Sequence, residues 1–343
     1  MNSLDRVMLA LNFEKTDRVP VDLHNFLVTC EYSGLPYNEV LTDGEKIADA
    51  QIMLWERLGH DMLLVENGTT AVAGALGCEI IYPERGSPYI AKHVLEENLE
   101  DFKKLKMIAP YEDGCLPELL KATNILSKKL GNRVCIMGRA DQGPFSLAVA
   151  LRGIEKFMLD LTDEEKHESI RRLIEFCTEV YLKFAEAQIK SGAHCTSMGD
   201  GFAGPSIVSP DIYENFAFPY QKRIGDFMKE RGYISSNHYC GNSTKIVHRL
   251  VETGIRILEI DDKTDLETTA KYCKGRVCIL GPVSTTVLHH GTPEEVKKLA
   301  LEAIEIAGQN SGFILGPGCA LAGETPLENI AALIEAAKIA AAV

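Results

Sequence analysis

Short apolar runs of strand length recur along the chain, and stretches rich in helix formers separate most of them. Continuous apolar runs are typical of strands buried on both faces of a parallel sheet. Eight parallel strands that alternate with helices close into a barrel, so we expect an α/β chain with the (β/α)8 TIM-barrel fold. The eight runs are Val19–Leu23, Met62–Val65, Val134–Gly138, Cys195–Met198, Ile234–Tyr239, Ile255–Ile260, Val277–Leu280 and Phe313–Leu315.

The stretches around these runs carry helix signals. An opening helix is expected over about Ser3 to Leu11, packed across the bottom of the barrel. Helical spacing continues through Pro210–Lys229, Lys245–Glu252 and Pro293–Ala307. The last of these begins with Thr292 as N-cap and a proline at the first helical position, a common start signal.

The domain organisation follows from this pattern. A Gly-Ser-Pro turn between two β-like runs predicts a hairpin at the barrel rim within Cys78–Val94. No glycine-rich phosphate loop follows the first run, which argues against a dinucleotide-binding fold. Residues 1–343 are therefore expected to form a single barrel domain with an N-terminal helical segment and a rim hairpin.

Charge and composition exclude several classes of partner. The net charge is −13, with Lys and Arg scattered among acidic residues, so neither nucleic acid nor an anionic membrane surface is an expected partner. No apolar run approaches the length of a membrane span, and the first residues carry charges where a signal peptide is apolar, which predicts a cytoplasmic protein. The ten cysteines are irregularly spaced, and those inside apolar runs (Cys135, Cys195, Cys278) are expected to be reduced core residues.

Barrel enzymes carry their chemistry at the carboxyl ends of the strands, and two of these ends hold candidate metal ligands. His238 and Cys240 are two residues apart at the end of one run, so their side chains project to the same side, and Cys319 follows the last run. One imidazole and two thiols suit Zn²⁺ and leave a coordination position open. The alternative is that these cysteines are small buried hydrophobes.

Further polar residues follow other runs at the same rim. Asp200 and Glu66 are candidate catalytic acids, and His24, Arg139, Tyr239 and Asp261 are candidate substrate-binding residues. Each has a structural alternative, since Asp261 could cap a turn, Arg139 could form an ion pair at the rim and Glu66 could be solvated.

Several motifs resemble a known family. HYCGN, ILEIDDKTDLE and GPGCALAGETPLENI are similar to the uroporphyrinogen decarboxylase superfamily, and within it to the zinc-dependent methylcobamide:thiol methyltransferases of the coenzyme M type, which act with corrinoid proteins. The resemblance implies that His238, Cys240 and Cys319 hold zinc. The stretch VDLHNFLVTCEYSG lacks the arginine-rich loop with which the decarboxylase branch grips propionates. The residues that follow Cys319 depart from the methanogen pattern, which leaves the identity of the thiol and the role of Glu324 open.

The resemblance implies methyl transfer between a corrinoid (cobalamin) protein and a small molecule, in one of two directions. Either a thiol acceptor is activated as a zinc thiolate, or a methoxy or methylamine donor is demethylated with a carboxylic acid as proton donor. The chain contains no corrinoid-binding motif of its own, so a partner protein is expected to supply the methylcobamide. The alternatives are a decarboxylase or lyase without metal and a non-enzymatic carrier of a corrinoid protein.

Overall fold

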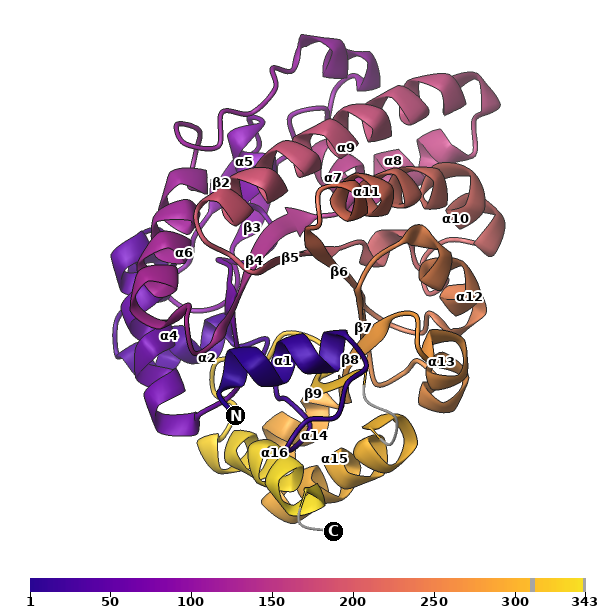
Figure 1. Ribbon diagram of the computed structural model, residues 1–343. Coiled ribbons are helices and arrows are strands. Elements are labelled where there is room, and N and C mark those ends of the chain that lie inside the picture. The colour runs from indigo at the N-terminus through magenta and orange to yellow at the C-terminus, as the bar shows by residue number, and fades with distance from the viewer. Residues whose placement is uncertain (309–311, 342–343) are drawn as a thin grey trace.

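The computed structural model describes residues 1–308 and 312–341 of the chain. Within these ranges, a curled parallel sheet of seven strands lies at the centre, in the order β1-β4-β5-β6-β7-β8-β9 (Figure 1). Seven of the eight apolar runs form these strands, so the predicted α/β class and the parallel pairing are confirmed. The strands are β1 (Met62–Val65), β4 (Cys135–Gln142), β5 (Cys195–Gly199), β6 (Ile234–Tyr239), β7 (Ile257–Ile260), β8 (Cys278–Val283) and β9 (Phe313–Pro317).

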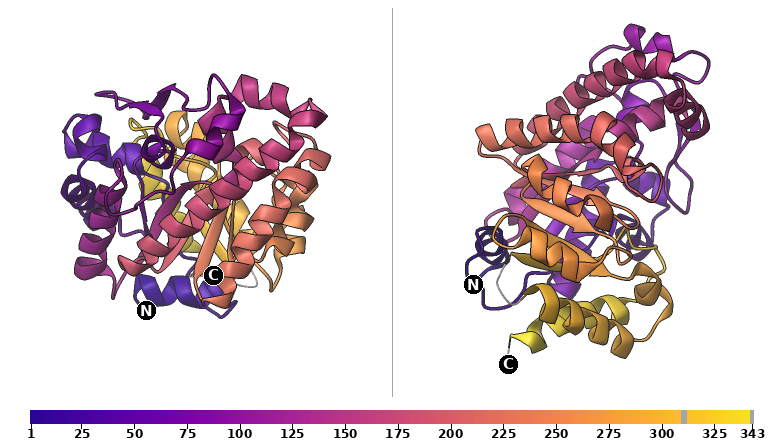
Figure 2. Two further views of the ribbon diagram at one scale, coloured as in Figure 1. Left: turned by 90° about the horizontal axis from the view of Figure 1, so that it is seen from above. Right: turned by 90° about the vertical axis from the view of Figure 1, so that its right-hand side faces the viewer.

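Helices cover the outer face of this sheet (Figures 1 and 2). They are α1 (Ser3–Leu11), α2 (Phe26–Ser33), α3 (Tyr37–Leu41), α4 (Gly44–Leu58), α5 (Ala71–Ala75), α6 (Leu116–Leu130), α7 (Pro144–Arg152), α8 (Ile154–Leu161), α9 (His167–Lys190), α10 (Pro210–Phe216), α11 (Phe218–Glu230), α12 (Val247–Leu250), α13 (Leu266–Cys273), α14 (Thr285–His290), α15 (Pro293–Ala307) and α16 (Leu327–Ala340). Over the described ranges, no helix is both long and apolar enough to cross a bilayer.

Two of the predicted helices differ in detail from the sequence pattern. The stretch Pro210–Lys229 is divided at Ala217 into α10 and α11, because Pro219 has no N–H and begins a new helix more readily than it continues one. The stretch Lys245–Glu252 forms only short turns around α12. The helix α15 has the predicted N-cap, and Thr292 and Glu295 form a capping box.

The helix α1 closes the amino-terminal end of the sheet, as predicted (Figure 2). Its apolar residues Val7 and Leu11 pack against inward-facing side chains of the strands, among them Met62, Cys195 and Cys278. These two cysteines and Cys135 are free, fully buried thiols, as expected for core positions. The predicted rim hairpin is also present as the antiparallel pair β2 (Glu79–Ile81) and β3 (Tyr89–Lys92).

The first apolar run, Val19–Leu23, is not a regular strand, so the prediction of eight strands is wrong at this position. The segment lies between β9 and β1, where it forms one isolated parallel bridge from Val21 to Leu315. Pro20 has no N–H to donate, and the N–H of Val21 donates to the Asp61 carboxylate (2.8 Å) instead of to a neighbouring strand. Because neither residue donates an N–H to a neighbouring strand, the segment pairs with β9 and β1 through only a few backbone hydrogen bonds. One of them runs from the N–H of Asp61 to Val21 O (2.8 Å).

A buried ion cluster holds this segment in place. The carboxylate of Asp61, fully buried before β1, is 2.6 Å from both the Arg6 guanidinium of α1 and the Arg18 guanidinium. Arg6 also pairs with Asp17 at 2.6 Å. The cluster therefore links α1, the segment 17–23 and β1 at the amino-terminal end of the sheet.

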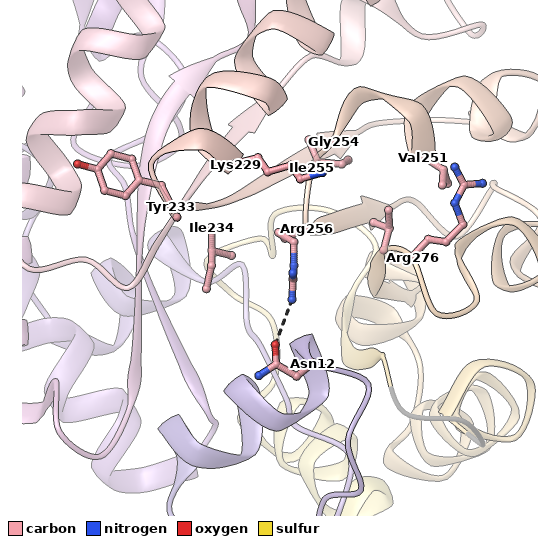
Figure 3. Close-up of a pocket in the computed structure, with 11 residues that line it drawn as sticks. Asn12, Lys229, Tyr233, Ile234, Val251, Gly254, Ile255, Arg256 and Arg276 are labelled. Atoms are coloured by element: carbon pink, nitrogen blue, oxygen red, sulfur yellow. Dashed lines mark hydrogen bonds between the residues drawn. The ribbon is translucent and has the colours of Figure 1, made fainter.

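A cavity of about 400 Å³ opens at the same end (Figure 3). Arg256, which precedes β7, reaches across it and donates to the backbone oxygen of Leu11 (2.6 Å) and to the side-chain oxygen of Asn12 (3.3 Å). The arginine thus anchors the end of α1. This cavity lies at the opposite end of the strands from the predicted site.

We expect Asp61→Asn to lower the free energy of unfolding by about 3–5 kcal/mol, because it leaves two arginines beside a neutral amide in a buried position. Asp49→Asn is the matched control, since Asp49 is exposed and forms a surface ion pair with Lys129, and its effect should stay within about 0.5 kcal/mol. Urea denaturation measures both. A loss below about 1 kcal/mol for Asp61→Asn would show that the cluster does not hold the segment.

A second prediction concerns His60, which is fully buried, with no hydrogen-bond partner for either ring nitrogen among the described residues. Burial lowers its pKa to about 4. The unfolded chain, with a pKa of about 6.5, therefore takes up a proton first as the pH falls. Burial of the neutral His60 ring therefore contributes stability that is complete above pH 6.5 and falls by about 3 kcal/mol between pH 6.5 and 4. Urea denaturation of His60→Leu should show a shallower decline over this window, and the exposed control His248→Gln should not.

Candidate metal centre

The strand β6 presents His238 near its carboxyl end, and Cys240 is the first residue after the strand. Gly241 then turns the chain with a φ of 79°, a conformation that favours glycine. The N–H of Gly241 donates to the Asp261 carboxylate (2.8 Å), which also accepts from the N–H of Lys263 (3.0 Å). Asp261 therefore holds the loop of Cys240, which is the structural role considered as its alternative.

Cys319 reaches the same place from the end of β9. Gly318 passes so close to the loop after β7 that a Cβ atom there would lie 2.7 Å from the backbone nitrogen of Asp262. The N–H of Gly318 donates to Val283 O (2.7 Å), and the N–H of Leu321 donates to His24 O (2.8 Å). Hydrogen bonds on both sides of Cys319 thus fix the turn that carries it.

The three predicted ligands meet in the structure. His238 Nε2 is 3.0 Å from Cys240 Sγ, Cys240 Sγ is 3.4 Å from Cys319 Sγ, and all three ligand atoms lie within 4.8 Å of one another. Tetrahedral zinc bonds of about 2.0–2.3 Å separate ligand atoms by roughly 3.3–3.8 Å. The observed separations of 3.0 and 3.4 Å are a few tenths of an ångström shorter than those of zinc-bound nitrogen–sulfur and sulfur–sulfur pairs. One nitrogen and two sulfurs could therefore hold a zinc ion after a small outward shift, with the fourth position open to a substrate.

A hydrogen bond of 3.4 Å joins the two thiols. A hydrogen bond from Cys240 lowers the pKa of Cys319, and the nearby His238 and His24 lower it further. The same hydrogen bond raises the pKa of Cys240, and burial adds to this rise. The pair therefore combines one thiol of lowered pKa with one of raised pKa, and a cation bound to both sulfurs would require both to be deprotonated.

Glu259 lies behind His238 and was not among the predicted site residues. The parallel register pairs His238 with Glu259, so both side chains point the same way, and Glu259 Oε2 is 3.7 Å from His238 Nδ1. The hydroxyls of Ser197 (2.7 Å) and Ser236 donate to the Glu259 carboxylate. Burial raises the pKa of Glu259, but Arg139 and His238 outweigh it, and the pKa is lowered. The signal in the sequence was a charged residue inside the apolar run Ile257–Ile260.

His24, Glu66 and Arg139 form a second buried group beside the ligands. His24 Nε2 is 2.6 Å from Glu66 Oε1, and the His24 ring lies 5.9 Å from the His238 ring, centroid to centroid. Burial opposes a charge on His24, but Glu66 outweighs it and raises the His24 pKa. Arg139 donates to Ser197 (3.0 Å) and lies 4.0 Å from Glu66 and 3.8 Å from Glu259.

Asp200 and Tyr239 lie elsewhere. The Asp200 carboxylate accepts from Ser146 N–H (2.8 Å) and from the Gln221 amide (2.6 Å), and the same amide contacts the Tyr239 hydroxyl. Both residues are fully buried, and burial raises the pKa of Asp200. The structure therefore brings these two residues together with each other but apart from His24 and Glu66.

A cavity of about 340 Å³ opens in front of the ligands at the carboxyl ends of β4, β5 and β6. Its volume is sufficient for a small molecule. Phe202 and Ile207 form its apolar side, whereas His238 and Cys240 line it next to the open metal position. The lining residues are Thr69, Arg139, Gln142, Gly199, Gly201, Phe202, Ser206, Ile207, His238, Cys240 and Gly241.

The chain is similar to known proteins over nearly its whole length. Residues 2–339 match the family model described as uroporphyrinogen decarboxylase (URO-D). The chain is 31% identical over 340 residues to the methylcobamide:CoM methyltransferase MtbA of Methanosarcina acetivorans, with 97% of each protein covered. It is also 30% identical over 271 residues to the uroporphyrinogen decarboxylase of Trichodesmium erythraeum, covering 77% of this chain and 73% of that protein.

Among solved structures, a methyltransferase from Methanosarcina mazei superposes with a TM-score of 0.89 at 26% identity, and 99% of each chain is covered. The similarity spans the sheet, the surrounding helices and the ends of the strands that carry the three ligands. The chain therefore belongs to the uroporphyrinogen decarboxylase family.

Proposed function

We propose that this protein is a zinc-dependent methyltransferase that moves a methyl group between a corrinoid protein and a small molecule. The group of His238, Cys240 and Cys319 beside an open cavity carries this proposal. Similarity over the whole chain to a methylcobamide:CoM methyltransferase supports the methyl transfer, the corrinoid and a thiol as the acceptor. We also propose that residues 1–343 act as one domain, and that segment 19–23 counts as the eighth position of a closed barrel.

A zinc ion held by these three residues would supply a Lewis acid that favours the thiolate form of a thiol or polarises the heteroatom of a methyl donor. Glu259 would keep the His238 ring oriented, with Nε2 toward the open position, through its contact with Nδ1. Phe202 and Ile207 would exclude water from the reacting atoms.

Proton transfer would use the His24–Glu66 pair. This pair is buried beside His238, and Glu66 raises the pKa of His24 against the effect of burial, which favours a proton on the ring. Of the two acids predicted from the sequence, we therefore propose Glu66, acting through His24, and leave Asp200 to hold the buried contacts of Ser146 and Gln221. Arg139 lines the cavity and remains a proposed substrate contact. Asp261 and Tyr239 would act indirectly, by holding the loop and the strand of the ligands.

A decarboxylase without metal is the second candidate, because one relative carries that name at 30% identity. That chemistry would not require the two thiols. Among the described residues that line the cavity, Arg139 is the one cation, which is few for a polyanionic porphyrinogen. Release of carbon dioxide from a porphyrinogen by protein that contains no zinc would favour this candidate.

We expect Cys240→Ala and Cys319→Ala each to lose zinc and methyl transfer while the protein stays folded, since the apolar core lies below the rim. Cys115→Ala is the control, because Cys115 is a free, half-buried thiol at the start of α6. Zinc content after dialysis and far-ultraviolet circular dichroism measure the outcome. If either ligand variant keeps full zinc and full methyl transfer, the ligand assignment is wrong.

The direction of transfer has a separate test. Addition of a small thiol to the zinc-loaded protein near pH 7 should release about one proton per chain, because a free thiol with a pKa of about 8.5 would bind as its thiolate. A pH indicator in weak buffer measures the release, with Cys319→Ala as control. If no small thiol releases a proton, yet a methoxy-aromatic or methylamine donor is demethylated with a Co(I) corrinoid protein, the thiol direction is excluded.

A further inference from the structure

We infer that the small substrate of this site is uncharged and mainly apolar, with a single hydrogen-bond acceptor, and that a substrate with an anionic tail is disfavoured. The inference rests on the proposed function, because it concerns the molecule that transfers the methyl group in the cavity beside the metal ligands. It goes beyond that function, which leaves the chemical class of the thiol or methyl donor open.

The walls of the cavity are the first observation. Phe202, in the turn after β5, and Ile207 supply its large side chains, and Ile207 is 50% exposed although it is apolar. Gly199, Gly201 and Gly241 leave parts of the wall without side chains. Thr69, Gln142 and Ser206 are its uncharged polar members. A wall of this kind favours contact with an apolar body over a solvated ion.

The charges around the cavity are the second observation. Arg139, the one cation among the described lining residues, lies between the carboxylates of Glu66 (4.0 Å) and Glu259 (3.8 Å). The carboxylates of Glu66 and Glu259 offset the charges of Arg139 and His24, so these four side chains leave no excess positive charge with which to attract an anion. Asp261 adds a further carboxylate under the loop of Cys240, and His24 is already paired with Glu66.

Two cations outside the cavity have acids in the same part of the surface. Lys245 belongs to a separate hollow next to Ser206, and Asp265 lines that hollow too. Arg85, which is exposed, lies 2.9 Å from Glu31 and 3.7 Å from Glu324. An anionic tail that left the cavity would therefore meet carboxylates beside each of these cations.

The third observation is a donor without a partner. The Nε atom of Arg139 is buried and has no hydrogen-bond partner among the described residues, since Glu66 Oε2 lies 4.0 Å away, beyond hydrogen-bond distance. A buried donor of this kind favours a ligand that brings an acceptor. A neutral oxygen satisfies it without adding a charge to the two carboxylates nearby. These observations together describe a compact, neutral molecule with one oxygen acceptor.

The test uses 3-mercaptopropionate and its methyl ester, two thiols with one skeleton that differ in charge near pH 7. With the zinc-loaded protein and methylcobalamin, we expect kcat/KM to be at least tenfold higher for the ester. Calorimetric dissociation constants should follow the same order, with a negative heat-capacity change for the ester because apolar surface is buried.

The two thiols also differ in acidity, and a comparison of the unmodified protein with Ile207→Lys cancels this difference. The ratio of ester to acid, for kcat/KM and for Kd, should fall at least tenfold from the unmodified protein to Ile207→Lys, because the new cation attracts the acid. Ile207→Met is the matched control and should keep the original ratio. Both ratios refer to the same pair of thiols, so their intrinsic reactivities cancel.

The two proposals fail differently. If the acid reacts and binds as well as the ester, and Ile207→Lys does not change the ratio, the inference is overturned while methyl transfer stands. If zinc is bound but neither thiol is methylated, the thiol direction of the proposed function is overturned, and the calorimetric ratio still decides the inference. If neither thiol binds, the inference is overturned as well.

Discussion

The parallel register of the central strands is the constraint on which the site depends. Parallel pairing brings the carboxyl ends of β6, β7, β8 and β9 to one edge, so that ligands far apart in sequence meet there. The pairing of His238 with Glu259 and of Arg139 with Ser197 places these four side chains on one face of the sheet. A shift of one residue in any of these pairs would turn a side chain of the site away from the cavity.

The charges of the site belong to side chains that this register places on one face of the sheet and to their neighbours. Glu259 and Glu66 are buried carboxylates, which is costly unless cations and hydrogen bonds compensate. Arg139 lies between them, the Ser197 and Ser236 hydroxyls donate to Glu259, and His24 pairs with Glu66. The charged residues beside His238 thus neutralise one another, and the two thiols lie next to this neutral group.

The sequence predicted the fold class and the three candidate ligands that the structure brings together, because both depend on local patterns. The two-residue spacing of His238 and Cys240 at a strand end shows that they share a face. By the same periodicity Tyr239 points to the opposite face, where it contacts Gln221, which also donates to Asp200. The register that brings Glu259 beside His238 depends on packing between distant segments, and so does the pairing of Val21 with Asp61, which prevents the first run from forming a regular strand.

The central claim is that His238, Cys240 and Cys319 bind one zinc ion and leave a position for the substrate. X-ray absorption at the zinc edge of the purified protein tests it most directly. We predict two sulfur ligands at about 2.3 Å with nitrogen or oxygen ligands at about 2.0–2.1 Å, and a third sulfur after a thiol is added. A zinc shell made only of nitrogen and oxygen, or stoichiometric zinc that keeps two sulfurs in Cys240→Ala, would contradict the account.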